Sequence, residues 1–179
     1  VADVVIIGGG VIGAATAFYA ARAGLRPVVL EAQDGLAMLT TAVSAGTFRL
    51  QFNEAELIRL VQQSLPVFHG FADEAGLPGW DIGLHIQGGL FASSQPPDAA
   101  PFRATLAQSQ VGERDVELLS GNAARQRFPF LVPETTSATY RSGDGWLSPH
   151  QLTYGFALGS QVPFLLRSRA TAIQVDAQG

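Results

Sequence analysis

The sequence contains no cysteine, no lysine and a single methionine among its 179 residues. Without cysteine, the chain forms no disulfide, no cysteine-ligated metal site and no cysteinyl cofactor link of its own. Every basic side chain is an arginine, 11 in all against 15 acidic residues, and the net charge of −4 gives no reason to expect a nucleic-acid partner. The three histidines have no close spacing, so we expect no metal site.

Long apolar runs are also missing. No run approaches the roughly 20 residues that a membrane-spanning helix needs, and the first run is broken by glycines and lacks basic flanks, unlike a signal peptide. We therefore expect no membrane span and a cytoplasmic location. Hydrophobic residues make up 47% of the chain and charged residues 15%, which predicts a globular fold with room for one domain, or one domain and part of another.

The most informative segment is the glycine-rich stretch 8–13, Gly-Gly-Gly-Val-Ile-Gly. It follows the apolar run 4–7 and opens the small-residue stretch 14–21. A second apolar run, 28–30, ends at Glu31. This order predicts a strand, a tight turn, a helix, a second strand and an acid, which is typical of a dinucleotide-binding βαβ unit.

Each position in this stretch has a physical role. Gly8 permits the sharp turn, Gly10 lets the backbone approach a diphosphate, and Gly13 lets the helix pack closely. The helix start at Val11 and Ile12 directs free N–H groups at the phosphates. Glu31 accepts hydrogen bonds from an adenosine ribose and repels a 2′-phosphate. A glycine turn alone is common, and the alternative for Glu31 is a solvated residue at a strand end.

The rest of the chain alternates helical and extended patterns. We expect a loop over 32–52, a helix from a capping box at Asn53 and Glu56 to Ala75 that Pro66 kinks or splits, and a C-cap at Gly76. Ser120 and Ser148 are expected helix caps, the latter followed by Pro149. The remaining expected elements are extended structure at 84–93, strands at 116–119, 138–141, 164–166 and 171–175, and helices at 102–110, 120–128 and 148–158.

Three segments in order resemble the FAD-dependent D-amino acid oxidase superfamily. The first is 3–13 with the strand and acid at 28–31. The second segment, 45–54, is similar to the one that follows the ribose-binding acidic residue in the sarcosine, glycine and dimethylglycine oxidoreductase branch. The third, 144–149, is similar to the D-G-x-x-x-P segment of that branch. The resemblance spans essentially the whole chain and corresponds to roughly the first half of a typical member.

The resemblance implies an α/β fold. Residues 1–50 and 143–179 would form a Rossmann-like FAD-binding βαβ core, and residues 51–142 a helical connection and a strand-rich substrate-domain excursion. The sequence supplies few parallel strands, and 176–179 looks like a turn without a returning strand. We expect the N-terminal portion of a longer protein or one part of a split enzyme, inactive alone; a compact natural domain is the alternative.

The resemblance also assigns cofactor-binding positions, with the FAD diphosphate on the turn 8–13 and the adenosine on Glu31. For Thr40, Thr41 and Ser44, hydrogen bonding within the loop is the alternative to a cofactor contact. Val43 stands where dimethylglycine-type relatives carry a flavin-linking histidine, which puts a covalent link in doubt. The other assigned positions are Ala32 after the ribose acid, Thr40 and Thr41 at the diphosphate and ribityl chain, Ser44, Ala45 and Gly46 beside the isoalloxazine ring, and Ala170, whose backbone contacts adenine.

Arg49 is the candidate for the substrate. It follows the flavin-proximal segment and could orient an amino-acid carboxylate through a bidentate pair; a surface or interdomain salt bridge is the alternative. The resemblance implies oxidation of a C–N bond of an amino acid or N-methylated amino acid, with hydride transfer to flavin. Two other hypotheses remain open: a noncatalytic FAD-binding piece that needs a second chain, and an NAD-dependent dehydrogenase, whose cofactor uses the same turn and acid.

Overall fold

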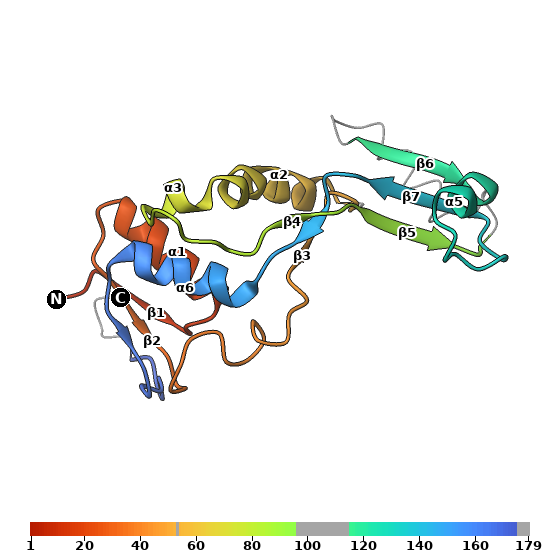
Figure 1. Ribbon diagram of the computed structural model, residues 1–179. Coiled ribbons are helices and arrows are strands. Elements are labelled where there is room, and N and C mark those ends of the chain that lie inside the picture. The colour runs from red at the N-terminus through yellow and green to blue at the C-terminus, as the bar shows by residue number, and fades with distance from the viewer. Residues whose placement is uncertain (53, 96–114, 175–179) are drawn as a thin grey trace. The chain divides into compact units, whose positions relative to one another are not determined.

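The computed structural model describes residues 1–52, 54–95 and 115–174 (Figure 1). The chain divides into two compact units, each with buried hydrophobic side chains of its own. Unit 1 comprises residues 1–46, 70–83 and 147–179, and unit 2 comprises residues 47–69 and 84–146.

A parallel sheet forms the base of unit 1. Its strands are β1 (Val4–Ile7), β2 (Pro27–Leu30) and β9 (Phe164–Leu165), in the order β1-β2-β9. Helix α1 (Val11–Arg22) connects β1 to β2 and lies against both, so the predicted βαβ unit is confirmed. The predicted strand at 171–175 is wrong for residues 171–174, which are irregular because no described strand pairs with them; residue 175 lies outside the described part.

Two further helices complete unit 1. Helix α6 (Pro149–Ser160) packs on α1, and the short helix α3 (Phe71–Ala75) packs on α6 (Figure 1). The Phe156 ring of α6 lies 5.3 Å from the Phe18 ring and 4.9 Å from the Phe71 ring. Ser148 caps α6 by accepting a hydrogen bond from the N–H of Gln151, as the serine–proline pair predicts. In unit 1, helix α1 therefore lies on the sheet, α6 lies on α1 and α3 lies on α6, with the rings of Phe18, Phe71 and Phe156 between the helices.

The helix expected over 53–75 breaks at a different residue from the one predicted. Helix α2 (Ala55–His69) continues through Pro66, and the chain leaves helical geometry at Gly70, where φ is −115° and ψ 31°. Gly76 ends α3 with φ 65°, which confirms the predicted glycine cap. Asn53 of the predicted capping box lies outside the described residues, and so does the helix predicted at 102–110.

Unit 2 contains two small antiparallel sheets. In the first, β8 (Gly145–Trp146) lies between β3 (Thr47–Phe48) and β4 (His85–Ile86). The loop expected over 32–52 thus contains one short strand. The extended segment expected over 84–93 is two strands, because Gly88 takes φ +88° and interrupts the pairing.

The second sheet of unit 2 has β7 (Ser137–Arg141) at its centre. It lies between β5 (Gly89–Ser93) and β6 (Val116–Ser120). Helix α5 (Gly121–Arg127) follows β6 directly, and Ser120 caps it by accepting a hydrogen bond from the N–H of Ala123, as predicted. These are the strand-rich elements expected between residues 51 and 142.

The compact units do not coincide with the predicted domain ranges. Residues 70–83, expected in the substrate portion, belong to unit 1 because Phe71 and Trp80 contact α6. Residues 47–50 and 143–146 belong to unit 2 because β3 and β8 pair there. The functional boundaries between the FAD-binding and substrate domains stay a prediction.

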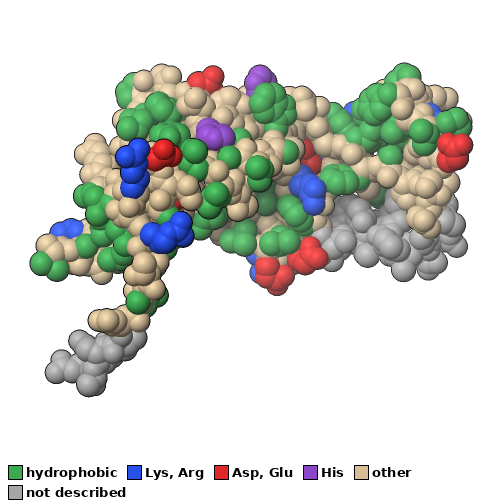
Figure 2. Space-filling model, turned by 90° about the horizontal axis from the view of Figure 1, so that it is seen from below, with side chains coloured by type: hydrophobic (Ala, Val, Ile, Leu, Met, Phe, Trp, Pro, Cys, Tyr) green, Lys and Arg blue, Asp and Glu red, His purple; other side chains and the backbone are tan. Residues whose placement is uncertain are grey.

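The surface reflects the low charge of the chain. On the face drawn in Figure 2, hydrophobic and uncharged side chains predominate and the arginines of the described residues are scattered. Among the described residues, no helix combines the length and apolar character that crossing a membrane requires.

We predict that Gly155→Ala destabilises unit 1. A Cβ at Gly155 would lie 2.3 Å from Cε1 of Phe71 and 2.7 Å from Nε1 of Trp80, so the substitution should lower the free energy of unfolding by about 1–3 kcal/mol despite the higher helix propensity of alanine. Urea unfolding of the full-length protein measures this change. Leu158→Ala, at an exposed position of the same helix, is the control; an unchanged midpoint for Gly155→Ala would contradict the packing described.

Candidate functional site

The three glycines of the turn after β1 meet different constraints, a positive φ at Gly8 and close contacts at Gly10 and Gly13. Gly8 takes φ +107°, and its N–H donates to the carbonyl of Leu30 at 2.8 Å. A Cβ on Gly13 would lie 1.9 Å from the carbonyl oxygen of Gly8, so the first turn of α1 packs directly against the turn. A Cβ on Gly10 would lie 3.0 Å from Oγ1 of Thr41. The positive φ of Gly8 and the close contacts at Gly10 and Gly13 explain the three glycines of the motif.

A cavity of about 440 Å³ adjoins this turn. Its lining carries hydroxyl groups and no carboxylate. The N–H groups of the first helical turn have no acceptor within the helix, and that of Val11 donates to Oγ1 of Thr41 at 3.2 Å. Together with the positive end of the helix dipole, these donors suit an anion such as a diphosphate. The lining residues are Ile6, Ile7, Gly8, Gly10, Val11, Ile12, Gly13, Thr16, Thr40, Thr41 and Ser44.

Glu31 is a positioned carboxylate rather than a solvated one. It is 9% exposed, and its Oε2 accepts the N–H of Gly9 at 2.6 Å while its Oε1 accepts the N–H of Gln33 at 2.7 Å. Each oxygen retains a lone pair for a further donor. Glu31 thus joins the end of β2 to the glycine turn and can accept ribose hydroxyls beside the diphosphate site.

Other predicted cofactor positions lie outside the cavity lining. Gly46 takes φ +66°, and a Cβ there would lie 2.1 Å from the carbonyl oxygen of Leu147, so this glycine is required by backbone packing. Ser44, which lines the cavity, also accepts the N–H of Gly46 at 3.1 Å, the loop hydrogen bond of the alternative interpretation. Ala32, Ala45 and Ala170 are likewise absent from the lining, and their roles stay predictions.

Arg49 follows β3 in unit 2 and lies between two aromatic rings. Its guanidinium carbon is 4.7 Å from the ring centre of Phe52 and 4.9 Å from that of Phe91. Its Nε is buried without a hydrogen-bond partner, and no ion pair within residues 1–52, 54–95 and 115–174 involves it. The salt bridge of the alternative interpretation is therefore not found in the described part of the chain.

Two small cavities in unit 2 share Arg49, one of about 190 Å³ and one of about 210 Å³. The first is bordered by the segments 87–91 and 144–146, and the second by Phe52 and helix α2. Phe52 and Phe91 were not among the predicted site residues. Phe52 is three positions after Arg49, but nothing local indicates Phe91, which comes from a different strand. Arg49 thus borders both cavities.

Comparison with known proteins agrees with this geometry. The family described as FAD dependent oxidoreductase matches residues 3–179. Dimethylglycine dehydrogenase of Rattus norvegicus, a mitochondrial protein, is 26% identical over 161 residues, which is 89% of this chain and 18% of that protein. Glycine oxidase from Bacillus cereus is 26% identical with a TM-score of 0.80, over 99% of this chain and 49% of that one.

A third similar protein supports the fold alone. L-proline dehydrogenase from P. horikoshii has a TM-score of 0.84 at 21% identity, and the match covers 99% of this chain and 47% of that one. The chain therefore spans about half the length of these solved structures and a smaller share of the curated relative.

We predict that Glu31→Gln weakens FAD binding about tenfold or more. The amide replaces one charged oxygen of the carboxylate that accepts the N–H groups of Gly9 and Gln33 and that would accept the ribose hydroxyls. Isothermal titration of the full-length apoprotein with FAD measures the change. Asp34→Asn removes the same charge three residues further on, where the side chain is 62% exposed, and should leave the affinity unchanged. Equal affinities for wild type and Glu31→Gln would show that Glu31 does not contact the cofactor.

Proposed function

The chain belongs to the FAD-dependent oxidoreductase family, and on that premise we propose that its protein oxidises a C–N bond of an amino acid or an N-methylated amino acid. The predicted family and α/β fold class are confirmed, and FAD is the cofactor of the family. The hypothesis of an NAD-dependent dehydrogenase is therefore set aside.

The observation that carries the cofactor part of the proposal is the glycine turn with its buried acid. The turn 8–13 and the hydroxyls of Thr40 and Thr41 would hold the diphosphate, and Glu31 would hold the ribose. The chemistry that bound FAD would supply is acceptance of a hydride from the carbon next to nitrogen, which would leave an imine for water to hydrolyse. The residues of unit 1 would bind and orient the cofactor. None of the residues that line the cavity beside the glycine turn is acidic, so no carboxylate in this lining repels the diphosphate.

Arg49 carries the substrate part of the proposal. A guanidinium presents paired N–H donors that match a carboxylate. Stacking between Phe52 and Phe91 limits the motion of this guanidinium, and its buried Nε has no protein acceptor. We propose that it binds and orients the substrate carboxylate and so places the amine end for oxidation.

The names of two of the similar proteins support the same substrate class, since dimethylglycine and glycine are both amino acids with a free carboxylate. The particular amino acid is not part of the proposal. A second chain that completes the protein and a cytoplasmic location stay predictions.

We predict that Arg49→Met raises the KM of the full-length holoprotein for its amino-acid substrate about 10- to 100-fold, the loss expected for one or two charge-assisted hydrogen bonds. Anaerobic bleaching of the flavin bands, measured with a panel of glycine, N,N-dimethylglycine, proline and D-alanine, identifies the substrate and gives the reduction rate as a function of its concentration.

The matched control for this substitution is Arg59→Met, which removes the same charge from an exposed position on α2 and should leave the KM unchanged. If neither this panel nor the remaining proteinogenic amino acids, tested in both configurations and as N-methyl derivatives, bleach the flavin, the proposed reaction is wrong. If Arg49→Met retains the wild-type KM, the carboxylate is bound elsewhere.

A further inference from the structure

We propose that Asp144 and Gln51 form a positioning network that holds Arg49 in its carboxylate-binding conformation. This inference rests on the role of Arg49 in the proposed function. Neither Asp144 nor Gln51 would touch the substrate; both would act through Arg49.

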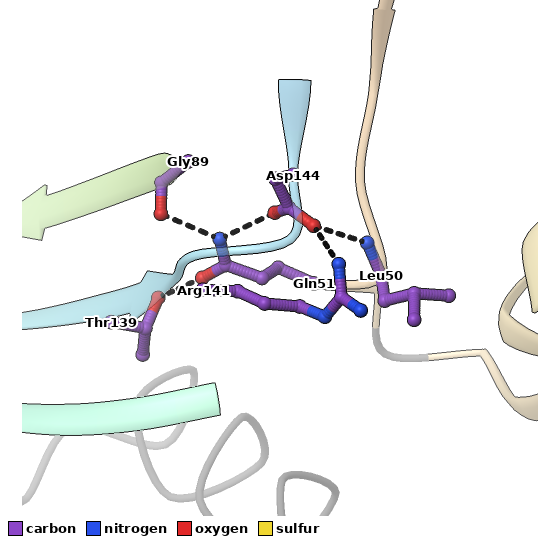
Figure 3. A network of polar contacts seen from close by, with 6 residues as sticks. All are labelled: Leu50, Gln51, Gly89, Thr139, Arg141 and Asp144. Atoms are coloured by element: carbon purple, nitrogen blue, oxygen red, sulfur yellow. Dashed lines mark hydrogen bonds and ion pairs between the residues drawn. The ribbon is translucent and has the colours of Figure 1, made fainter. Parts of the chain in front are cut away.

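Asp144 is the centre of this network (Figure 3). Its side chain is 2% exposed, and its Oδ1 accepts the backbone N–H of Leu50 at 3.1 Å and Nη1 of Arg141 at 2.9 Å. Its Oδ2 accepts Nε2 of Gln51 at 2.8 Å. The carboxylate therefore fixes the two residues that directly follow Arg49.

Gln51 extends the network to the second sheet of unit 2. Its Nε2 also donates to the carbonyl of Gly89 at 2.9 Å, and its Oε1 accepts the hydroxyl of Thr139 at 2.7 Å (Figure 3). One amide thus binds Asp144, the start of β5 and the middle of β7. Such a fully satisfied polar group specifies one arrangement of the segments that it joins.

The network reaches both rings that hold the guanidinium. Phe52 directly follows Gln51, and Phe91 lies two residues after Gly89 on the same strand. The carbonyl of Asp144 also accepts the N–H groups of Gln87 and Gly88, which lead into that strand. Displacing the network would therefore move Arg49 and both of its aromatic contacts together.

The second argument for this positioning role is that Asp144 forms its ion pair with Arg141 and not with Arg49. The carboxylate of Asp144 is paired with Arg141, whose side chain is 11% exposed, and not with Arg49. A buried carboxylate requires a close cation or several donors, and Asp144 has both. Because the carboxylate of Asp144 is neutralised by Arg141, it does not pair with Arg49. The Arg49 guanidinium can therefore bind the carboxylate of a ligand.

The test uses isosteric changes in the full-length holoprotein. Propionate and its neutral analogue propionamide are titrated as probes, and binding is followed by isothermal titration calorimetry. Gln51→Met keeps the side-chain volume and removes the amide; we expect the Kd for propionate to rise about tenfold, while the weak binding of propionamide and the affinity for FAD stay unchanged.

Matched variants separate positioning from general destabilisation. Thr136→Val removes a hydroxyl that bonds to the carbonyls of Ser93 and Gln95 elsewhere in unit 2, and should not affect propionate binding. In Arg49→Met, Gln51→Met should cause no further loss, because its effect passes through Arg49. Asp144→Asn should also weaken propionate binding. Because it leaves the buried Arg141 beside a neutral amide, it also destabilises the fold, and the test therefore depends on Gln51→Met.

The outcomes distinguish the inference from the proposed function. If Arg49→Met weakens propionate binding while Gln51→Met binds as tightly as wild type, the positioning role is wrong and the proposed function stands. An additive loss in the double variant also overturns the positioning role. If Arg49→Met binds propionate normally, the carboxylate role of Arg49 is wrong, and the inference is overturned with it.

Discussion

The close approach of α1 to the turn that precedes it is the constraint on which the rest of unit 1 depends. With only 1.9 Å between the position of a Cβ on Gly13 and the carbonyl oxygen of Gly8, the helix can begin at the end of β1 only if residue 13 is a glycine. This contact directs the helix N-terminus into the cavity. The same geometry places the N–H of Gly9 at Glu31, so the turn and the acid belong to one continuous structure.

The two candidate sites are built by different means. The cofactor cavity of unit 1 is made largely of backbone and hydroxyl groups from residues 6–16 and 40–44, which can contact a phosphorylated ligand without a positive side chain. The environment of Arg49 in unit 2 is made of side chains. Its cation is placed by aromatic stacking, while a neighbouring buried carboxylate is neutralised by Arg141. Because Arg141 neutralises Asp144, the carboxylate of Asp144 does not form an ion pair with Arg49.

Much of the local structure could be predicted because its causes are local. The strand–turn–helix unit, the serine caps at Ser120 and Ser148, and the glycine cap at Gly76 each depend on a few consecutive residues. The predictions were wrong where a local signal competes with packing. Proline predicts a kink or a split at residue 66, and α2 continues to His69 without a split. The strand pattern at 171–174 forms no strand, because no described strand pairs with it.

By itself, the sequence determined the dinucleotide motif, the family and the identity of Arg49 as a candidate, because each is carried by contiguous residues or a single motif. Only the tertiary structure decided that Glu31 is buried against Gly9, that Phe91 stacks on Arg49, and that Asp144 binds the two residues that follow Arg49. The physical reason is the separation of the contacting residues along the sequence. These contacts join segments separated by tens of residues, and such pairs come together only when strands pair and their side chains are buried side by side.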